Sequence, residues 1–115
     1  MNAIRRDEVP DEVHSIYVDQ WDWEKALTPQ MRSEEYLRDT VRDIVAAVCF
    51  TLAEVKKMYP QLCVSISRHV SFVTTQQLED RWPELSPRQR EEAYVREHPT
   101  AFIMQIGGRL KSGRR

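Results

Sequence analysis

The most informative part of this chain is residues 13–24, which read VHSIYVDQWDWE. Most of these residues are β-branched or aromatic, and such residues favour β-strands. Strand side chains alternate between two faces, so one face would carry His14, Ile16, Val18, Gln20, Asp22 and Glu24. That face is apolar in its middle and ends in an amide and two carboxylates. A ligand-binding site would produce such an end, and so would a strand that runs out into solvent near Asp22.

Residues 30–59 predict one long α-helix. Apolar residues recur every three or four positions along one face, namely Leu37, Val41, Ile44, Val48, Leu52, Val55 and Tyr59. Thr28 and Pro29 provide a start signal, and Pro60 ends the helix. At ~1.5 Å per residue it would be about 45 Å long, and the rest of the chain offers little surface for it to pack on. Its outer charged residues are predicted to be solvated: Arg38, Asp39, Arg42 and Asp43.

Two shorter helices are predicted from their caps. After a short strand at residues 70–73, Thr74 begins a helix with Gln77 as its capping-box partner, and that helix ends before Pro83. Ser86 and Gln89 repeat the signal, with Pro87 in the first turn. This second helix is expected to run to about residue 98.

A strand at residues 101–106 follows, and Gly107-Gly108 then predicts a tight turn before a short polar tail. Residues 1–12 are polar and are predicted to be a loop. The order of elements indicates an α+β fold in which helices cover one side of a sheet.

The composition excludes several classes of protein. The chain has 17 Lys and Arg against 18 Asp and Glu, a net charge of -1, so no surplus of cations favours nucleic acid as a partner. With 41% hydrophobic and 30% charged residues the chain is expected to be globular. It has no long apolar run, so neither a signal peptide nor a membrane span is expected.

The cysteines and histidines predict no metal site. Cys49 and Cys63 do not form a CxxC pair, and we expect two buried free thiols in a reducing cytoplasm, with a disulfide as the alternative. The three histidines are far apart and lack metal-ligand spacing.

The candidate site groups lie near the two ends of the chain: Arg5, Glu8, Gln20, Asp22, Glu24 and the Gly107-Gly108 turn. No nucleophile–base pair, GxGxxG motif or P-loop is present. Arginine binds a phosphate through a two-pronged, charge-assisted contact, and glutamine and aspartate can hold an α-amino group or a water bound to Mg²⁺. A glycine pair alone is weak evidence, and the combination of these groups is more telling than any one of them.

These residues resemble a known family. Residues 14–24 are similar to the signature strand of asparagine synthetase A, the aspartate–ammonia ligase. Met1-x-Ala3-Ile4-Arg5-x-Asp7-Glu8 and Ile106-Gly107-Gly108-Arg109-Leu110 resemble the same family in the same order. The resemblance covers essentially the whole chain.

The resemblance implies a fold and a reaction. The fold is the antiparallel-sheet catalytic core of class II aminoacyl-tRNA synthetases, here as a single partial domain over residues 1–115. The reaction uses ATP and Mg²⁺ to convert aspartate into β-aspartyl-AMP, which ammonia then attacks to give asparagine, AMP and pyrophosphate. The family is homodimeric and cytoplasmic.

The resemblance also assigns roles to individual residues. Arg5 matches the motif-two arginine that binds the α-phosphate, and Gln20 matches the glutamine that contacts aspartate and the adenylate. Asp22 would be a second-rank substrate residue on the same strand. Glu8 is a weaker candidate for the adenine edge, and Gly107-Gly108 would lie against the adenylate.

The chain departs from the family in length. The aspartate-binding acid, a phosphate-contacting lysine, an acidic metal-binding segment and the third motif are not found in it, so we expect no catalysis by this chain alone. A class II tRNA synthetase fragment and a non-catalytic interaction module are the alternatives. Because a partial sheet leaves open edges and an uncovered face, we expect poor stability or self-association.

Overall fold

The computed structural model describes residues 2–12, 14–22 and 24–113. Contacts within the chain divide it into two compact units, Met1–Met31 and Arg32–Arg115, and each is described by itself. That residues 1–115 act as one partial catalytic domain stays a prediction.

The first unit contains an antiparallel hairpin. Strand β1 (Asn2–Ile4) pairs with β2 (Tyr17–Asp19), in a register that sets Ala3 opposite Val18. The backbone N–H of Arg5 donates to the carbonyl of Ile16 at 2.7 Å, which continues the ladder by one residue. A single turn of 3₁₀ helix, η1 (Pro29–Met31), lies at the end of this unit.

The strand predicted at residues 13–24 is shorter in the structure and covers only Tyr17–Asp19. Asn2, the first residue of β1, pairs with Asp19, so the described ladder has no partner for the residues beyond it. Asp22 and Glu24 are exposed and lie outside the strand. Val13 and Trp23, which the prediction included, lie outside the described residues.

The second unit begins with the long helix α1 (Glu34–Met58). The predicted start at Thr28-Pro29 is wrong, because Pro29 begins η1 and the helix starts after Ser33. The Ser33 hydroxyl accepts the N–H of Tyr36 at 3.2 Å, and acidic residues in the first turn favour the positive end of the helix dipole. The helix ends before Pro60, as predicted.

The remaining elements are β3 (Ser71–Thr74), α2 (Thr75–Arg81), α3 (Pro87–Glu97) and β4 (Ala101–Met104). Both predicted capping boxes are present, Thr74 with Gln77 and Ser86 with Gln89. The fold is mixed α and β with small sheets, compatible with α+β.

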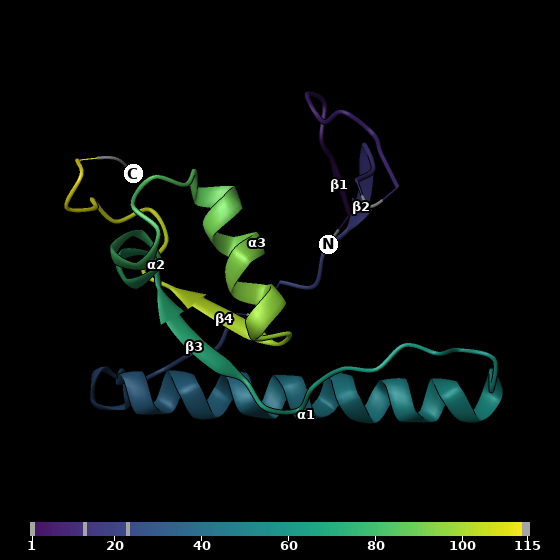
Figure 1. Ribbon diagram of the computed structural model, residues 1–115. Helices are drawn as coiled ribbons and strands as arrows, with labels where there is room; N and C mark the ends of the chain where they lie inside the picture. The colour runs from purple at the N-terminus through teal and green to yellow at the C-terminus, as the bar shows by residue number, and fades with distance from the viewer. Residues whose placement is uncertain (1, 13, 23, 114–115) are drawn as a thin grey trace. The chain divides into compact units, whose positions relative to one another are not determined.

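The pairing of β3 with β4 is parallel, from Ser71 opposite Ala101 to Thr74 opposite Met104. A parallel pair needs a crossover connection, which α2 and α3 provide, as Figure 1 shows. The expected antiparallel sheet therefore describes β1 and β2 but not β3 and β4.

The two faces of β3 and β4 pack differently. On one face Val73 packs with Leu78 of α2 and Tyr94 of α3, and Ile103 lies against this cluster. On the other face Phe72 meets Phe102 edge to face, with ring centroids 6.0 Å apart.

The Phe72 ring also lies beneath two arginines of α1. The guanidinium of Arg38 is 4.7 Å from the ring centroid, and that of Arg42 is 5.4 Å, within the range of a cation–π contact. Two sequence predictions are therefore wrong. Helices flank both faces of this strand pair, and these two arginines do more than face solvent.

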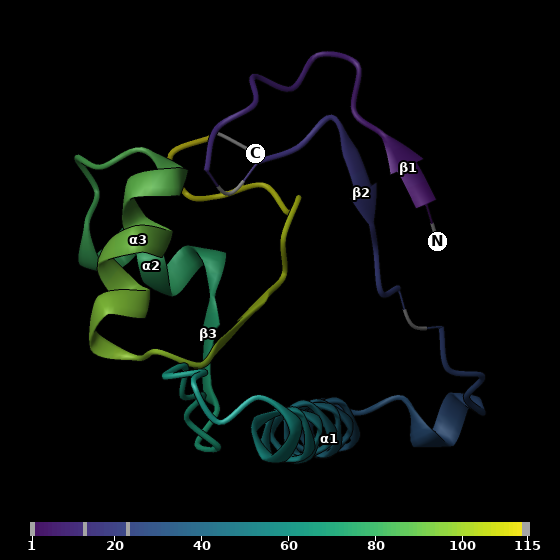
Figure 2. The same ribbon diagram turned by 90° about the vertical axis from the view of Figure 1, so that its right-hand side faces the viewer.

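Helix α1 is thinly covered, as its length led us to expect. Val41 is its only residue classed as buried among the described ones. Residues 60–70 run back along the helix in Figure 1, and Figure 2, which views α1 end-on, shows this segment close to it. The thiol of Cys49 approaches the carbonyl of Ile66 at 4.0 Å. Both cysteines are free, but neither is fully buried as predicted, since Cys49 is partly exposed and Cys63 is exposed.

No helix among the described residues is long and apolar enough to cross a bilayer.

Candidate functional site

Arg5 lies where β1 turns into the following loop. The N–H of Glu8 donates to the carbonyl of Arg5 at 3.2 Å and closes a turn. The turn brings the Arg5 guanidinium to 3.6 Å from the Glu8 carboxylate, with side chains 48% and 27% exposed. Such an exposed ion pair contributes roughly 0–1 kcal/mol. A phosphate can therefore compete with Glu8 for the guanidinium at little cost.

The register of the hairpin relates Arg5 to Gln20. Side chains directly opposite each other share a face, and the pattern repeats every second residue. Arg5, opposite Ile16, is on the face of Ala3 and Val18, and continuing the alternation adds Gln20. Ala3, Val18 and Gln20 are partly buried, and Asn2, Ile4, Tyr17 and Asp19 of the other face are exposed. Arg5 and Ile16, at the far end of the first face, are exposed as well.

The spacing on this face suits an adenylate. Gln20 is four residues along the ribbon from the position opposite Arg5, which at ~3.3 Å per residue is about 13 Å. An aminoacyl adenylate held lengthwise could place its phosphate at Arg5 and its amino acid at Gln20. The ladder ends at Asp19, so Gln20 is placed only by continuing the alternation one residue further, and the argument does not reach Asp22 or Glu24.

The loop between β1 and β2 contains a contact that the sequence interpretation missed. Asp11 Oδ1 accepts the backbone N–H of His14 at 2.8 Å and lies 2.7 Å from His14 Nδ1. The N–H of Asp11 in turn donates to the carbonyl of His14 at 3.1 Å. The short spacing of an aspartate and a histidine three residues later was an available signal. The contact gives the loop a defined form next to Arg5.

The Gly107-Gly108 turn lies in the second unit. The N–H of Gly108 donates to the carbonyl of Gln105 at 3.4 Å, and Gly107 has φ +83°. A positive φ at the third position of a turn favours glycine. A Cβ at Gly107 would meet nothing within 4 Å, so the tip of the turn presents open backbone. Gln105 itself has φ +61°, which is uncommon for a residue other than glycine.

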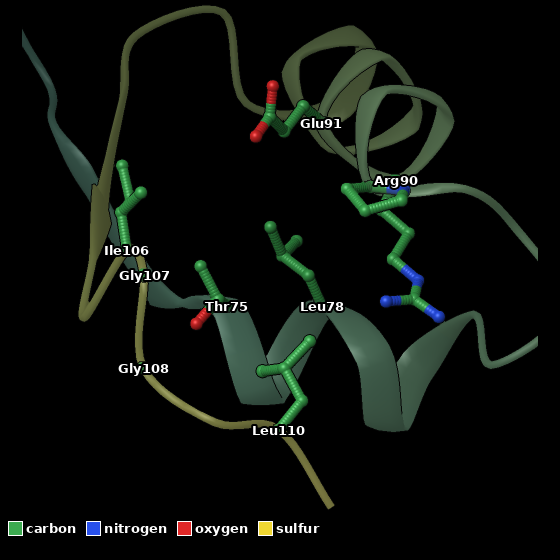
Figure 3. Close-up of a pocket in the computed structure, with 9 residues that line it drawn as sticks. Thr75, Leu78, Arg90, Glu91, Ile106, Gly107, Gly108 and Leu110 are labelled. Atoms are coloured by element: carbon green, nitrogen blue, oxygen red, sulfur yellow. The ribbon is translucent and has the colours of Figure 1, made fainter. Parts of the chain in front are cut away.

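A small pocket lies beside this turn. Its volume is about 130 Å³, below the ~300–1,000 Å³ typical of ligand pockets. Figure 3 shows the backbone of Gly107 and Gly108 along one wall, with the Arg90 guanidinium pointing toward α2 rather than into the middle. The lining consists of Thr75, Leu78, Pro87, Arg90, Glu91, Ile106, Gly107, Gly108 and Leu110. The pocket is too small for a whole nucleotide, and the turn forms part of its rim.

A buried polar network lies behind the pocket and was not predicted. Glu79 and Arg90, with side chains 7% and 4% exposed, form an ion pair at 3.5 Å. Arg90 also donates to the carbonyls of Trp82 and Pro83 at 2.9 and 3.0 Å. No local pattern could reveal this network, because its partners are many residues apart in the chain.

Two carboxyl groups of α2, those of Glu79 and Asp80, have lowered pKa values. The Ser112 hydroxyl donates to Glu79 and does most to lower the pKa of that carboxyl. Gln76, the Ser112 N–H and Arg90 act in the same direction, and burial opposes them. The hydrogen bond from Lys111 likewise lowers the pKa of Asp80, with help from Gln76.

Within the part of the chain that the structure describes, no three His, Cys, Asp or Glu side chains gather closely enough to hold a metal ion.

The site residues thus fall into two groups. Arg5 and Glu8 are in contact in the first unit and share a hairpin with Gln20. Gly107 and Gly108 belong to the second unit. The catalytic and binding roles given to these residues and to Asp22 stay predictions.

Comparison with known proteins gives a consistent result. A family model described as aspartate-ammonia ligase matches residues 1–115. An aspartate–ammonia ligase of Fusobacterium nucleatum is 47% identical over 113 residues, which are 98% of this chain and 35% of the relative. Those of Lactobacillus acidophilus and Levilactobacillus brevis are 52% and 49% identical, over 96% and 100% of this chain and 33% and 34% of their own lengths.

The chain therefore spans about a third of the length of the curated relatives that it matches. The match is nonetheless long and close, and it includes the hairpin, the long helix and the glycine turn. On this evidence the chain belongs to the aspartate–ammonia ligase family.

Proposed function

We propose that this chain supplies part of the active site of an AMP-forming aspartate–ammonia ligase that takes part in asparagine biosynthesis. The family match supports the reaction class. The single observation that supports the site is the hairpin register from Asn2–Asp19 to Ile4–Tyr17. If its alternation continues by one residue at each end, Arg5 and Gln20 would share a face about 13 Å apart. The activity, substrates and partners of the whole enzyme are part of the proposal.

The proposed reaction has two steps. An oxygen of the aspartate side-chain carboxylate attacks the α-phosphorus of ATP, and the bond from that phosphorus to the bridging oxygen breaks to release pyrophosphate. Ammonia then attacks the activated carbonyl carbon and loses a proton as the bond to AMP breaks. Mg²⁺ bound to the ATP phosphates would offset their negative charge.

The contribution of this chain is positioning and electrostatic. Arg5 would bind the α-phosphate, where charge develops in the first step, and such preorganised stabilisation is a major source of rate. Gln20 would hold the aspartate end of the adenylate, with Asp22 beside it. Glu8 would release Arg5 and turn to the adenine edge, and the open backbone of Gly107-Gly108 would lie against the adenylate.

Three broader properties belong to the same proposal. We expect the complete catalytic core to have the class II aminoacyl-tRNA synthetase fold, and the protein to act as a homodimer in the cytoplasm. We expect neither nucleic acid nor a membrane as a partner, because the chain has a net charge of only -1 and no helix in the described ranges fits a bilayer.

Titration of Mg·ATP into the purified chain tests the role of Arg5. A hydrogen bond to a charged group contributes roughly 1.5–3 kcal/mol, so Arg5→Ala should weaken binding about 10-fold to 100-fold. Arg6→Ala is the matched control, because its neighbouring guanidinium is 91% exposed and pairs only loosely with Asp7, at 3.5 Å. Equal affinities of the two variants would contradict the assignment.

Aspartate-dependent exchange of pyrophosphate into ATP tests the chain as a catalyst. We expect none, because the chain spans only about a third of its relatives. Robust exchange would contradict this expectation and show that the residues of this chain suffice to form the adenylate. Binding of tRNA would instead favour a class II tRNA synthetase, and a fold that binds neither nucleotide nor tRNA would favour a non-catalytic interaction module.

A further inference from the structure

The chain that follows the glycine turn is fastened to helix α2. The N–H of Lys111 donates to Gln76 Oε1 at 2.9 Å, and its ammonium group lies 3.1 Å from Asp80. The Ser112 hydroxyl donates to Glu79 at 2.6 Å, and its N–H donates to the other carboxylate oxygen at 3.3 Å. The predicted polar tail is therefore anchored through three side chains of one helix.

Glu79 is the centre of this attachment. Its carboxylate receives the two bonds from Ser112, a bond from Gln76 at 3.1 Å and the contact with Arg90. A buried carboxylate is costly unless it is hydrogen-bonded and paired, and Ser112 supplies two of its donors. The attachment is thus coupled to the ion pair that joins α2 to α3.

The attachment brackets the glycine turn from both sides. Before the turn, Thr75 Oγ1 donates to the carbonyl of Gln105 at 3.1 Å. After the turn, Leu110 is 9% exposed and lies beside Leu78 in Figure 3. Between these two points, nothing lies within 4 Å of where a Cβ of Gly107 would be. The tip of the turn is open while both of its ends are fixed.

We propose that Gln76, Glu79 and Asp80 of α2 are positioning residues, which hold the Gly107-Gly108 turn in the conformation that contacts a nucleotide. The inference rests on the proposed function, because it takes the turn to lie against the adenylate. None of the three carboxylate and amide side chains needs to touch the nucleotide. They act through Lys111 and Ser112, which set where the chain leaves the turn.

The test substitutes Lys111 and Ser112, which bond to α2, rather than Glu79. Glu79→Ala would leave Arg90 buried without its carboxylate and is expected to unfold the unit. Ser112→Ala removes the hydroxyl donor and leaves the ion pair in place, and Ser112→Thr restores the hydroxyl. Lys111→Met removes the bond to Asp80, and Lys57→Met is its control, because Lys57 pairs with Glu54 on the surface of α1.

Two measurements on the full chain decide the matter. Amide hydrogen exchange at Gly107 and Gly108 reports how well ordered the turn is. Titration with Mg·ATP reports whether the turn contributes to nucleotide binding. For Ser112→Ala and Lys111→Met we expect exchange at Gly108 to be about 10-fold faster and the Kd for Mg·ATP to rise several-fold, with core amides near Val73 unchanged. Ser112→Thr and Lys57→Met should behave like the unsubstituted chain.

Unchanged exchange at the glycines in both variants would overturn the inference. So would faster exchange with an unaltered Kd, because the turn would then be ordered for some purpose other than the nucleotide. If the unsubstituted chain bound no Mg·ATP, the proposed function and the inference would fall together. If it bound Mg·ATP but neither Ser112→Ala nor Lys111→Met had an effect, only the inference would fail.

Discussion

At the scale of single residues, Glu79 links the pH of the solution to the stability of the second unit. The Ser112 hydroxyl and the other donors hold its folded-state pKa below the ordinary value of 4.5. A lowered pKa means that the unfolded chain takes up the proton more readily. The stabilisation is therefore fully present above about pH 4.5 and is lost as the pH falls through the lower folded-state pKa. Asp80 acts in the same direction.

Urea unfolding between about pH 3 and pH 7 checks this linkage. We expect the stability of the unsubstituted chain to decline on acidification, and Ser112→Ala to decline less steeply because its Glu79 loses the principal donor. Ser65→Ala, in the exposed segment between α1 and β3, serves as the control. Parallel pH profiles for all three proteins would show that the Ser112 hydroxyl does not set the Glu79 pKa.

At the scale of elements, the capping box of α3 makes a separate prediction. The Ser86 hydroxyl accepts the N–H of Gln89, and the Gln89 side chain accepts the N–H of Ser86 at 3.0 Å. Losing such a cap costs about 1 kcal/mol, so Ser86→Ala should lower the denaturation midpoint of the second unit, whereas Ser86→Asp should retain most of the stability. A melt that stays unchanged in Ser86→Ala would mean that the tertiary contacts of Arg90 and Tyr94, rather than the cap, order α3.

At the scale of the whole molecule, exposed apolar side chains predict self-association. Phe50 and Met58 of α1 are 67% and 69% exposed, and Ile106 at the glycine turn is 73% exposed. No described side chain reaches the deepest level of burial, under 2% exposed, so the core is small for the apolar surface left open.

Sedimentation at several concentrations should show association of the chain, and Phe50→Gln should reduce it. A Leu27→Gln variant is a matched control, because Leu27 is an exposed apolar residue of the other unit. A monomer with a sharp and reversible melt would contradict the expectation of an incompletely covered fold.

Local signals in the sequence predicted much of the second unit. Thr74 with Gln77 and Ser86 with Gln89 each act within one helical turn, so the residues that start α2 and α3 are visible without any tertiary structure. A local signal also gave a wrong start for α1 at Thr28-Pro29. In the structure a 3₁₀ turn begins at Pro29, and Ser33 is the cap of the helix. At the hairpin, the prediction of a loop over residues 1–12 was wrong, because Asn2–Ile4 forms β1. The short length of β2 was also missed, because it depends on that partner strand.

The sequence alone was enough to determine the caps of α2 and α3, the stop at Pro60 and the membership of the family, because each depends on neighbouring residues or on matched residue order. Only the tertiary structure decided that β3 and β4 are parallel, that Arg38 and Arg42 lie on Phe72, and that Ser112 bonds to Glu79. These contacts join residues about 30 positions apart. Their energy appears only when the chain has packed, and no spacing rule within one element can reveal it.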